Sequence, residues 1–237
     1  MDYHDLEFRY RQKYNEIQYA NSTNLVSNFY HKYMERGLDK TSFPRVLEIG
    51  AGSGEHFGFV RHEYASYIMS DLIHPVLLPR VQEMVENLKV NSKKEILLEM
   101  QNIENLSYEN CSFDRIIVSC LLHHLSNPVA GLAEVRRVIK DEGLVTIYLP
   151  SDPGILYRAA QNLVSNQTFL KFFSKQEIKF LRACQHRNHV ASLIDMIESL
   201  FEFDDITWTS FPKINIGWNT RFFQICSIRV NKNLNLI

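Results

Sequence analysis

Short apolar runs alternate along this chain with longer segments in which apolar residues recur every three or four positions. The runs at residues 46–49, 67–71, 96–101, 113–120 and 144–149 predict buried strands. Helical periodicity occurs at residues 55–65, 75–90 and 128–140, and Pro75 and Pro128 are placed to open the last two helices. Alternating strands and helices predict an α/β fold built on a doubly wound, mostly parallel sheet.

The two ends of the chain depart from this alternation. Residues 1–43 are expected to be helical, and Gly37 and Pro44 mark the exit toward the first strand. Residues 155–200 are also predicted to be mostly helical. Two aromatic-rich runs at 201–211 and 222–230 then predict strands joined by a short loop, which can connect antiparallel strands but not parallel ones. We therefore expect a seven-stranded sheet that ends in an antiparallel hairpin.

A glycine-rich turn follows the first predicted strand. Gly50, Gly52 and Gly54 come directly after a strand that contains Glu48. Glycine has no Cβ atom, so the backbone here can approach a ligand closely. A dinucleotide site needs G-x-G-x-x-G, but Glu55 stands at the third glycine's position, and no Gly-Lys-Ser/Thr of a P-loop follows. A tight turn without a ligand remains the alternative on this pattern alone.

The turn and the segments after it resemble class I S-adenosylmethionine (SAM) dependent methyltransferases, which carry Glu or Asp followed by G-x-G-x-G at this point. The resemblance covers about residues 44–150, and the terminal hairpin is similar to the family's last two strands. It implies a Rossmann-like methyltransferase fold, SAM as methyl donor and S-adenosylhomocysteine as product. The cofactor-binding residues that it implies are Glu48, Gly50, Gly52, Gly54, Asp71, Leu72, Asn102, Ile103 and Ser119.

Several of these residues have a physical reason to bind SAM. Glu48 is expected to accept from the cofactor's ammonium group, and Asp71 from the ribose diol, because a carboxylate accepts two hydrogen bonds. A solvated turn acid is the alternative for Asp71. Asn102 and Ile103 stand where the family has an Asp-Ala pair against the adenine, and an amide oxygen can accept from the adenine amino group. We also expect Tyr14 of the N-terminal helices near the cofactor, with plain packing of those helices against the sheet as the alternative.

Histidines follow the fourth strand, where the methyl acceptor of this family binds. His123 or His124 could act as a general base, which is needed when the acceptor is a hydroxyl. The His-His-Leu run is, however, common in the subfamily whatever the substrate. We therefore keep both histidines as candidate catalytic residues beside the alternative that they only shape the loop.

A positively charged segment lies beyond the common core. Residues 153–189 contain six lysines or arginines against one acid, Glu177. Within this segment Arg182, His186 and His189 have i, i+4 and i+7 spacing, which places them on one face of a helix. Because Arg binds phosphate and carboxylate bidentately, these three residues predict an anionic acceptor. The alternative is a solvated basic face with the histidines packed against the sheet.

Composition limits the partners. A formal net charge of −1 indicates no nucleic-acid partner, and no apolar run approaches the roughly 18 residues of a membrane helix. The four cysteines lack C-x-x-C pairing, so we expect neither a metal nor a disulfide framework, which fits the cytoplasm. The acidic, polar N-terminus is not expected to be a signal peptide.

These observations predict one methyltransferase domain over residues 1–237, acting as a monomer or homodimer. We divide it into a helical lid (1–43), a SAM-binding core (44–150), a helical acceptor-side insertion (151–200) and a terminal hairpin (201–237). The expected reaction is methyl transfer to an oxygen or nitrogen of a small anionic metabolite: a phosphorylated compound, a nucleotide-linked sugar or a carboxylate. The alternatives are a protein or RNA methyltransferase and a non-catalytic SAM-binding partner protein.

Overall fold

Seven strands form one sheet in the computed structural model, which describes residues 2–18, 21–72, 81–83, 94–213 and 216–232. The strand order across the sheet is β3 (Glu95–Met100), β2 (Ser66–Asp71), β1 (Arg45–Ile49), β4 (Phe113–Ser119), β5 (Ile139–Pro150), β7 (Phe223–Arg229) and β6 (Asp205–Phe211). The first five strands of this order pair in parallel, whereas β7 pairs antiparallel with both β5 and β6. The predicted doubly wound sheet with an antiparallel hairpin is confirmed.

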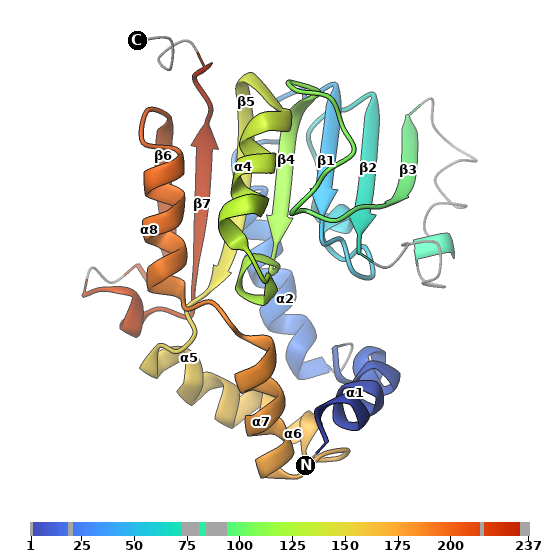
Figure 1. The fold of residues 1–237 in the computed structure, drawn as a ribbon, viewed down its shortest axis with the longest axis vertical. Helices are drawn as coiled ribbons and strands as arrows, with labels where there is room; N and C mark the ends of the chain where they lie inside the picture. Colours follow the sequence, from blue (N-terminus) through green and yellow to red (C-terminus); the bar gives the residue numbers. More distant parts are fainter. Residues whose placement is uncertain (1, 19–20, 73–80, 84–93, 214–215, 233–237) are drawn as a thin grey trace.

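The helices divide into two groups (Figure 1). Helices α4 (Pro128–Val138) and α8 (Val190–Leu200) pack on one face of the sheet, and α2 (Asn21–Met34) lies on the other. The second group gathers beyond the carboxyl ends of the parallel strands: α1 (Tyr3–Gln18), α5 (Ile155–Ala160), the π-helical η4 (Gln161–Ser165), α6 (Asn166–Phe169) and α7 (Lys175–Gln185). Three 3-10 turns complete the described elements: η1 (His56–Phe59), η3 (Leu122–His124) and η5 (Trp218–Thr220). None of the helices within the described residues is both long and apolar enough to cross a membrane.

Helices on both faces explain why the central strands are apolar almost throughout. Leu47 and Ile116 pack into one buried cluster with α4 and α8, and Val46 and Ile117 pack into a second that includes Met34 of α2. Successive side chains of a strand point to opposite faces, so each of these strands contributes to both clusters. Each fully buried aliphatic side chain contributes about 1.5–3 kcal/mol, which makes β1 and β4 the rigid base of the molecule.

The segment after the glycine turn differs from the prediction. A helix was expected over residues 55–65, but the turn η1 ends at Phe59 and the chain then becomes extended. Backbone pairing with the segment before β1 accounts for the difference, because Phe43 N–H donates to the Glu63 carbonyl at 2.9 Å and Glu63 N–H donates to the Thr41 carbonyl at 3.0 Å. The predicted helix over 75–90 falls largely outside the described residues.

The helical region after β5 also differs from the prediction. The helix that carries Arg182 ends at Gln185, and α8 begins only at Val190. The intervening amides of Arg187 and Asn188 donate to the His123 carbonyl at 2.9 and 3.2 Å, so the chain turns toward η3 instead of continuing as a helix. Arg182, His186 and His189 therefore do not share one helical face.

Candidate functional site

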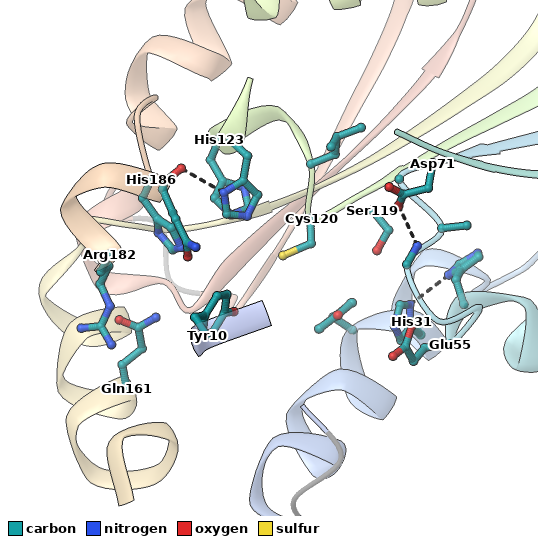
Figure 2. A pocket seen from close by; sticks show the side chains of 18 of the residues that line it. Tyr10, His31, Glu55, Asp71, Ser119, Cys120, His123, Gln161, Arg182 and His186 are labelled. Carbon is teal, nitrogen blue, oxygen red and sulfur yellow. Dashed lines mark hydrogen bonds between the residues drawn. The ribbon is translucent and has the colours of Figure 1, made fainter. Parts of the chain in front are cut away.

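A cavity of about 400 Å³ opens at the carboxyl ends of β1 and β4, where the strand order reverses. Open α/β sheets bind ligands at this point. Figure 2 shows Arg182 and His186 on one side of the cavity and Asp71 and Ser119 on the other. We call these sides the histidine half (His123, His124, Arg182 and His186) and the glycine-turn half (Glu48, Gly50, Gly52, Asp71 and Ser119).

The glycine turn is held against β2 by its own backbone. Gly50 and Ala51 N–H donate to the Ser70 carbonyl at 2.8 and 2.9 Å, and Gly52 N–H donates to Asp71 Oδ2 at 3.0 Å. Gly52 has a φ of +51°, and a Cβ atom added there would meet only Glu55 Oε2, 3.8 Å away. Glycine is needed at this position for its left-handed backbone, and its missing side chain leaves the space beside the turn open to a ligand.

Glu48 is a buried carboxyl that lines the cavity. It accepts a hydrogen bond from the Tyr67 hydroxyl at 2.7 Å. Burial raises the pKa of Glu48 to about 7, although the neighbouring His56 and the Tyr67 hydrogen bond act in the opposite direction. Binding a cationic group would remove the cost of ionising this carboxyl, so the site is suited to a ligand that carries an ammonium.

The histidine half is made by η3 and the end of α7. The ring centroids of His123 and His186 lie 4.6 Å apart, and those of His123 and His124 lie 3.9 Å apart. The Gln185 carbonyl accepts from His124 Nδ1 at 2.9 Å. Burial and the adjacent His186 lower the pKa of His124 to about 4, and burial lowers the pKa of His123 well below its usual value. Both imidazoles are therefore neutral at pH 7 and each keeps one ring nitrogen with an unshared electron pair.

Arg182 and Asp152 bring charge to this half. Arg182 lines the cavity and is partly buried. Because burial leaves the guanidinium incompletely hydrated, it lowers the pKa of Arg182. The Asp152 carboxylate accepts from His186 Nδ1 at 2.7 Å and from Arg158 Nε at 2.9 Å. The arrangement presents a cation and neutral imidazoles to any ligand that lies between the two halves.

The predicted site residues are distributed unevenly around the cavity. Those that line it are Glu48, Gly50, Gly52, Asp71, Ser119, His123, His124, Arg182 and His186. Gly54 belongs to the same turn, with a φ of +73°, but is not among the lining residues. His189 is exposed and outside the lining, because the helix breaks before it.

The predicted cofactor-binding residues Leu72, Asn102 and Ile103, of which the last two were expected against the adenine, also lie outside the cavity lining. Leu72 is 68% exposed, Ile103 is buried in the core, and the Asn102 side chain accepts from Glu104 N–H at 3.0 Å. Tyr14 belongs to α1, but its side chain lies outside the described part of the chain. The roles expected of these four residues stay predictions.

Sequence reasoning missed part of the lining. Tyr10 of α1, Tyr30 and His31 of α2, and Tyr157 of α5 line the cavity, and none of them belongs to a motif. Asp152 is not among the lining residues but bonds to His186, and it had a usable signal, since it lies two residues after β5 at the edge where the other strand-end acids lie. The aromatic lining residues gave no such signal in the sequence, because aromatic residues that line a cavity cannot be told from those that pack in a core.

Comparisons with known proteins agree with this geometry. Residues 47–147 match the family model described as a methyltransferase domain. The uncharacterized methyltransferase YcgJ of Bacillus subtilis is 30% identical over 116 residues, covering 46% of this chain and 43% of that protein. A ubiquinone/menaquinone biosynthesis C-methyltransferase of Citrifermentans bemidjiense is 29% identical over 114 residues, covering 46% of either protein. The matched region thus spans less than half the length of each of these two curated relatives.

Solved structures share the fold over a larger part of the chain. The YcgJ crystal structure has a TM-score of 0.57 at 15% identity and covers 86% of this chain and 99% of that one. The small RNA methyltransferase HEN1 has a TM-score of 0.64 at 13% identity, over 86% of this chain and 25% of that one. At these identities the likeness concerns the fold alone.

Proposed function

The chain belongs to the class I SAM-dependent methyltransferases, and on that premise we propose that it methylates an oxygen or nitrogen of a small anionic metabolite. The family and the fold imply SAM as methyl donor and S-adenosylhomocysteine as product. The acceptor classes proposed are phosphorylated compounds, nucleotide-linked sugars and carboxylates. One observation carries the proposal: Arg182 and the histidines of η3 line the same cavity as the glycine turn, Glu48 and Asp71.

The glycine-turn half fits the methyl donor. The turn leaves open space beside Gly52, Glu48 is suited to an ammonium, and Asp71 can accept from ribose hydroxyls. A cavity of about 400 Å³ lies within the range of sites for ligands of this size. We propose that Glu48 accepts from the ammonium of the cofactor's methionine part, that Asp71 accepts from the hydroxyls of its ribose, and that Ser119 lines the space near the sulfur.

The histidine half is proposed to bind the acceptor. Arg182 can pair with a phosphate or carboxylate through parallel hydrogen bonds, and the attraction is strengthened because the site is partly shielded from water. The helices α1 and α2, which contribute Tyr10 and Tyr30 to the lining, are proposed to cover the bound ligands as a lid. The lid would hold acceptor and donor together and exclude water.

The reaction requires little acid–base chemistry from the protein. Bound SAM would supply an electrophilic methyl group to a lone pair of the acceptor, and the electron pair of the broken carbon–sulfur bond would stay on sulfur. A hydroxyl acceptor also loses its proton, which we assign to His124 or His123. His124 is suited to this step because the carbonyl of Gln185 holds its Nδ1 proton and leaves Nε2 with a lone pair.

Radiolabelled SAM tests the proposal against the two alternatives. The chain is incubated with fractionated metabolite extracts, with protein and with RNA, and Glu48→Ala serves as the control that cannot bind the donor well. Label in a small anionic molecule supports the proposal. Label in a polymer indicates a protein or RNA methyltransferase, and tight SAM binding without transfer to any fraction indicates a non-catalytic SAM-binding protein.

A further inference from the structure

Three histidines converge in the histidine half of the cavity. One ring nitrogen from each of His123, His124 and His186 lies within 4.8 Å of the others. They come from two separate parts of the chain, η3 and the end of α7, which the amides of residues 187 and 188 join by hydrogen bonds to the His123 carbonyl. Figure 2 shows the rings of His123 and His186 facing the same part of the cavity.

Hydrogen bonds on the side away from the cluster orient the rings of His124 and His186. His124 donates its Nδ1 proton to the Gln185 carbonyl at 2.9 Å, and His186 donates its Nδ1 proton to Asp152 Oδ2 at 2.7 Å. When such a ring carries only this one proton, its Nε2 is left with an unshared electron pair. A carbonyl or carboxylate behind the ring is the usual outer partner of a metal-binding histidine, because it fixes the tautomer and makes the ring a stronger donor of electrons.

His123 is buried, and within the described residues its Nδ1 has no hydrogen-bond partner. Buried polar nitrogens are nearly always paired, so an unpaired one calls for an explanation. The adjacent imidazoles do not provide a partner, because their own protons are directed outward to Gln185 and Asp152. A cation placed among the three rings would give the unpaired nitrogen of His123 a partner.

We propose that His123, His124 and His186 bind one divalent transition-metal ion in the cavity. Imidazole ligands favour zinc, iron, nickel or copper over magnesium or calcium. Zinc ligands at tetrahedral geometry lie about 3.3 Å apart, so the three nitrogens would have to move closer together than they are here. Three protein ligands leave a fourth position open, as in catalytic zinc sites.

The open position would face the space between the two halves of the cavity. This part of the inference rests on the proposed function: an anionic oxygen of the acceptor would occupy that position, with Arg182 binding another of its charged groups. With the ion bound, His124 Nε2 would be a ligand and not the base of the proposed function. The metal would then act by orienting the acceptor and by lowering the pKa of a bound hydroxyl, which would release its proton to solvent. Binding of the ion itself does not depend on which acceptor is used.

The test measures metal binding directly on the tag-free chain after treatment with a chelator. Co²⁺ is added and its visible absorption recorded, since tetrahedral coordination gives a strong characteristic band, and Zn²⁺ is then titrated calorimetrically. We expect one ion per chain. The variants His124→Ala and His186→Ala should each bind at least tenfold more weakly, and Asp152→Asn about 10–100-fold more weakly through loss of the outer hydrogen bond.

The matched control is His189→Ala, which removes an exposed histidine close in sequence but outside the cavity lining and should leave metal affinity unchanged. SAM affinity and thermal unfolding of each variant establish that it is folded. Absence of Zn²⁺ binding by the folded wild-type chain overturns the inference, as does equal affinity in the double variant lacking His124 and His186. Metal binding without methyl transfer to any acceptor would refute the proposed function but not the metal site.

Discussion

The guanidinium group of Arg115 makes two hydrogen bonds to the carboxylate of Glu35, at 3.0 and 2.5 Å, and both side chains are buried. His56 Nε2 donates to the same carboxylate at 2.8 Å, and His31 Nδ1 lies 3.0 Å from His56 Nδ1. Arg115 is on β4, His56 follows the glycine turn, and His31 is on α2. Because His31 and His56 also line the cavity, this buried network connects the cavity wall to the rigid strands.

Removing one member of the Arg115–Glu35 pair should destabilise the protein strongly. Glu35→Gln leaves a buried guanidinium without its counter-charge, and we expect the free energy of unfolding to fall by about 3–5 kcal/mol. Urea denaturation measures the change. The control is Glu16→Gln, whose partner Lys13 is 42% exposed and whose loss should cost less than about 1 kcal/mol. A loss below about 1 kcal/mol in Glu35→Gln would contradict the assigned role.

Stability should decrease as the pH falls below about 6.5. Burial is the main reason that the pKa of His31 is lowered to about 2, and the nearby His56 lowers it as well. Burial is also the main cause of the lowered pKa of His123, and the adjacent His124 and His186 add to it. The unfolded chain takes up these protons near pH 6.5, whereas the folded chain does not, so protonation favours unfolding. Each histidine contributes up to about 1.4 kcal/mol per pH unit below 6.5. Glu48 acts in the opposite direction between about pH 4.5 and 7, because its pKa is raised in the folded chain.

A substitution at His31 separates the contribution of this histidine to the pH dependence of stability from that of Glu48. His31→Gln should reduce the slope of unfolding free energy against pH by about 1 kcal/mol per pH unit between pH 6 and 4.5. Chemical denaturation at several pH values, with chelator present, measures both slopes. Identical slopes in the variant and the wild type would mean that His31 is protonated in the folded chain or that it is accessible to water.

SAM affinity should depend on the ionisation of Glu48. The ligand-free carboxyl has a pKa of about 7, and pairing with an ammonium favours the ionised form. Affinity should therefore rise as the pH increases from 5.5 to 7, by up to tenfold per pH unit, and level off above that. Calorimetric titration over this range measures it. Glu48→Gln should bind more than tenfold more weakly at pH 7.5 and lose the pH dependence; a wild-type profile in this variant would remove Glu48 from the site.

Arg182 should affect acceptor binding and leave donor binding unchanged. Loss of a charge-assisted pair costs about 1.5–3 kcal/mol, so Arg182→Ala should raise the Michaelis constant for an anionic acceptor roughly 10–100-fold. Initial-rate kinetics measure that constant, and calorimetry checks that SAM affinity is retained. The control is Lys179→Ala, an exposed residue of α7 outside the cavity lining. Equal Michaelis constants in the two variants would rule out a role for Arg182 in acceptor binding.

The sequence by itself determined the order of the strands along the chain, the sheet class and the place of the glycine turn, whereas the helix expected over 55–65 is the short turn η1. Apolar periodicity indicates which side of an element is buried, and glycine at positions 50 and 52 indicates a backbone with positive φ, which other residues rarely adopt. Both patterns involve residues close together in the chain, so they can be interpreted without knowledge of the fold. Ligands of open α/β sheets bind at the carboxyl ends of the strands, and this placed Glu48, Asp71 and Ser119 at one edge of the sheet, where the cavity lies.

Only the tertiary structure decided which distant residues meet. Helical spacing grouped His189 with Arg182 and His186, but competing backbone hydrogen bonds to the His123 carbonyl end α7 at Gln185 and separate them. The same bonds bring His186 beside His123. Contacts such as Arg115–Glu35 and His186–Asp152 join segments far apart in the chain, and no local period encodes them, because their energy comes from burial and pairing that exist only after folding.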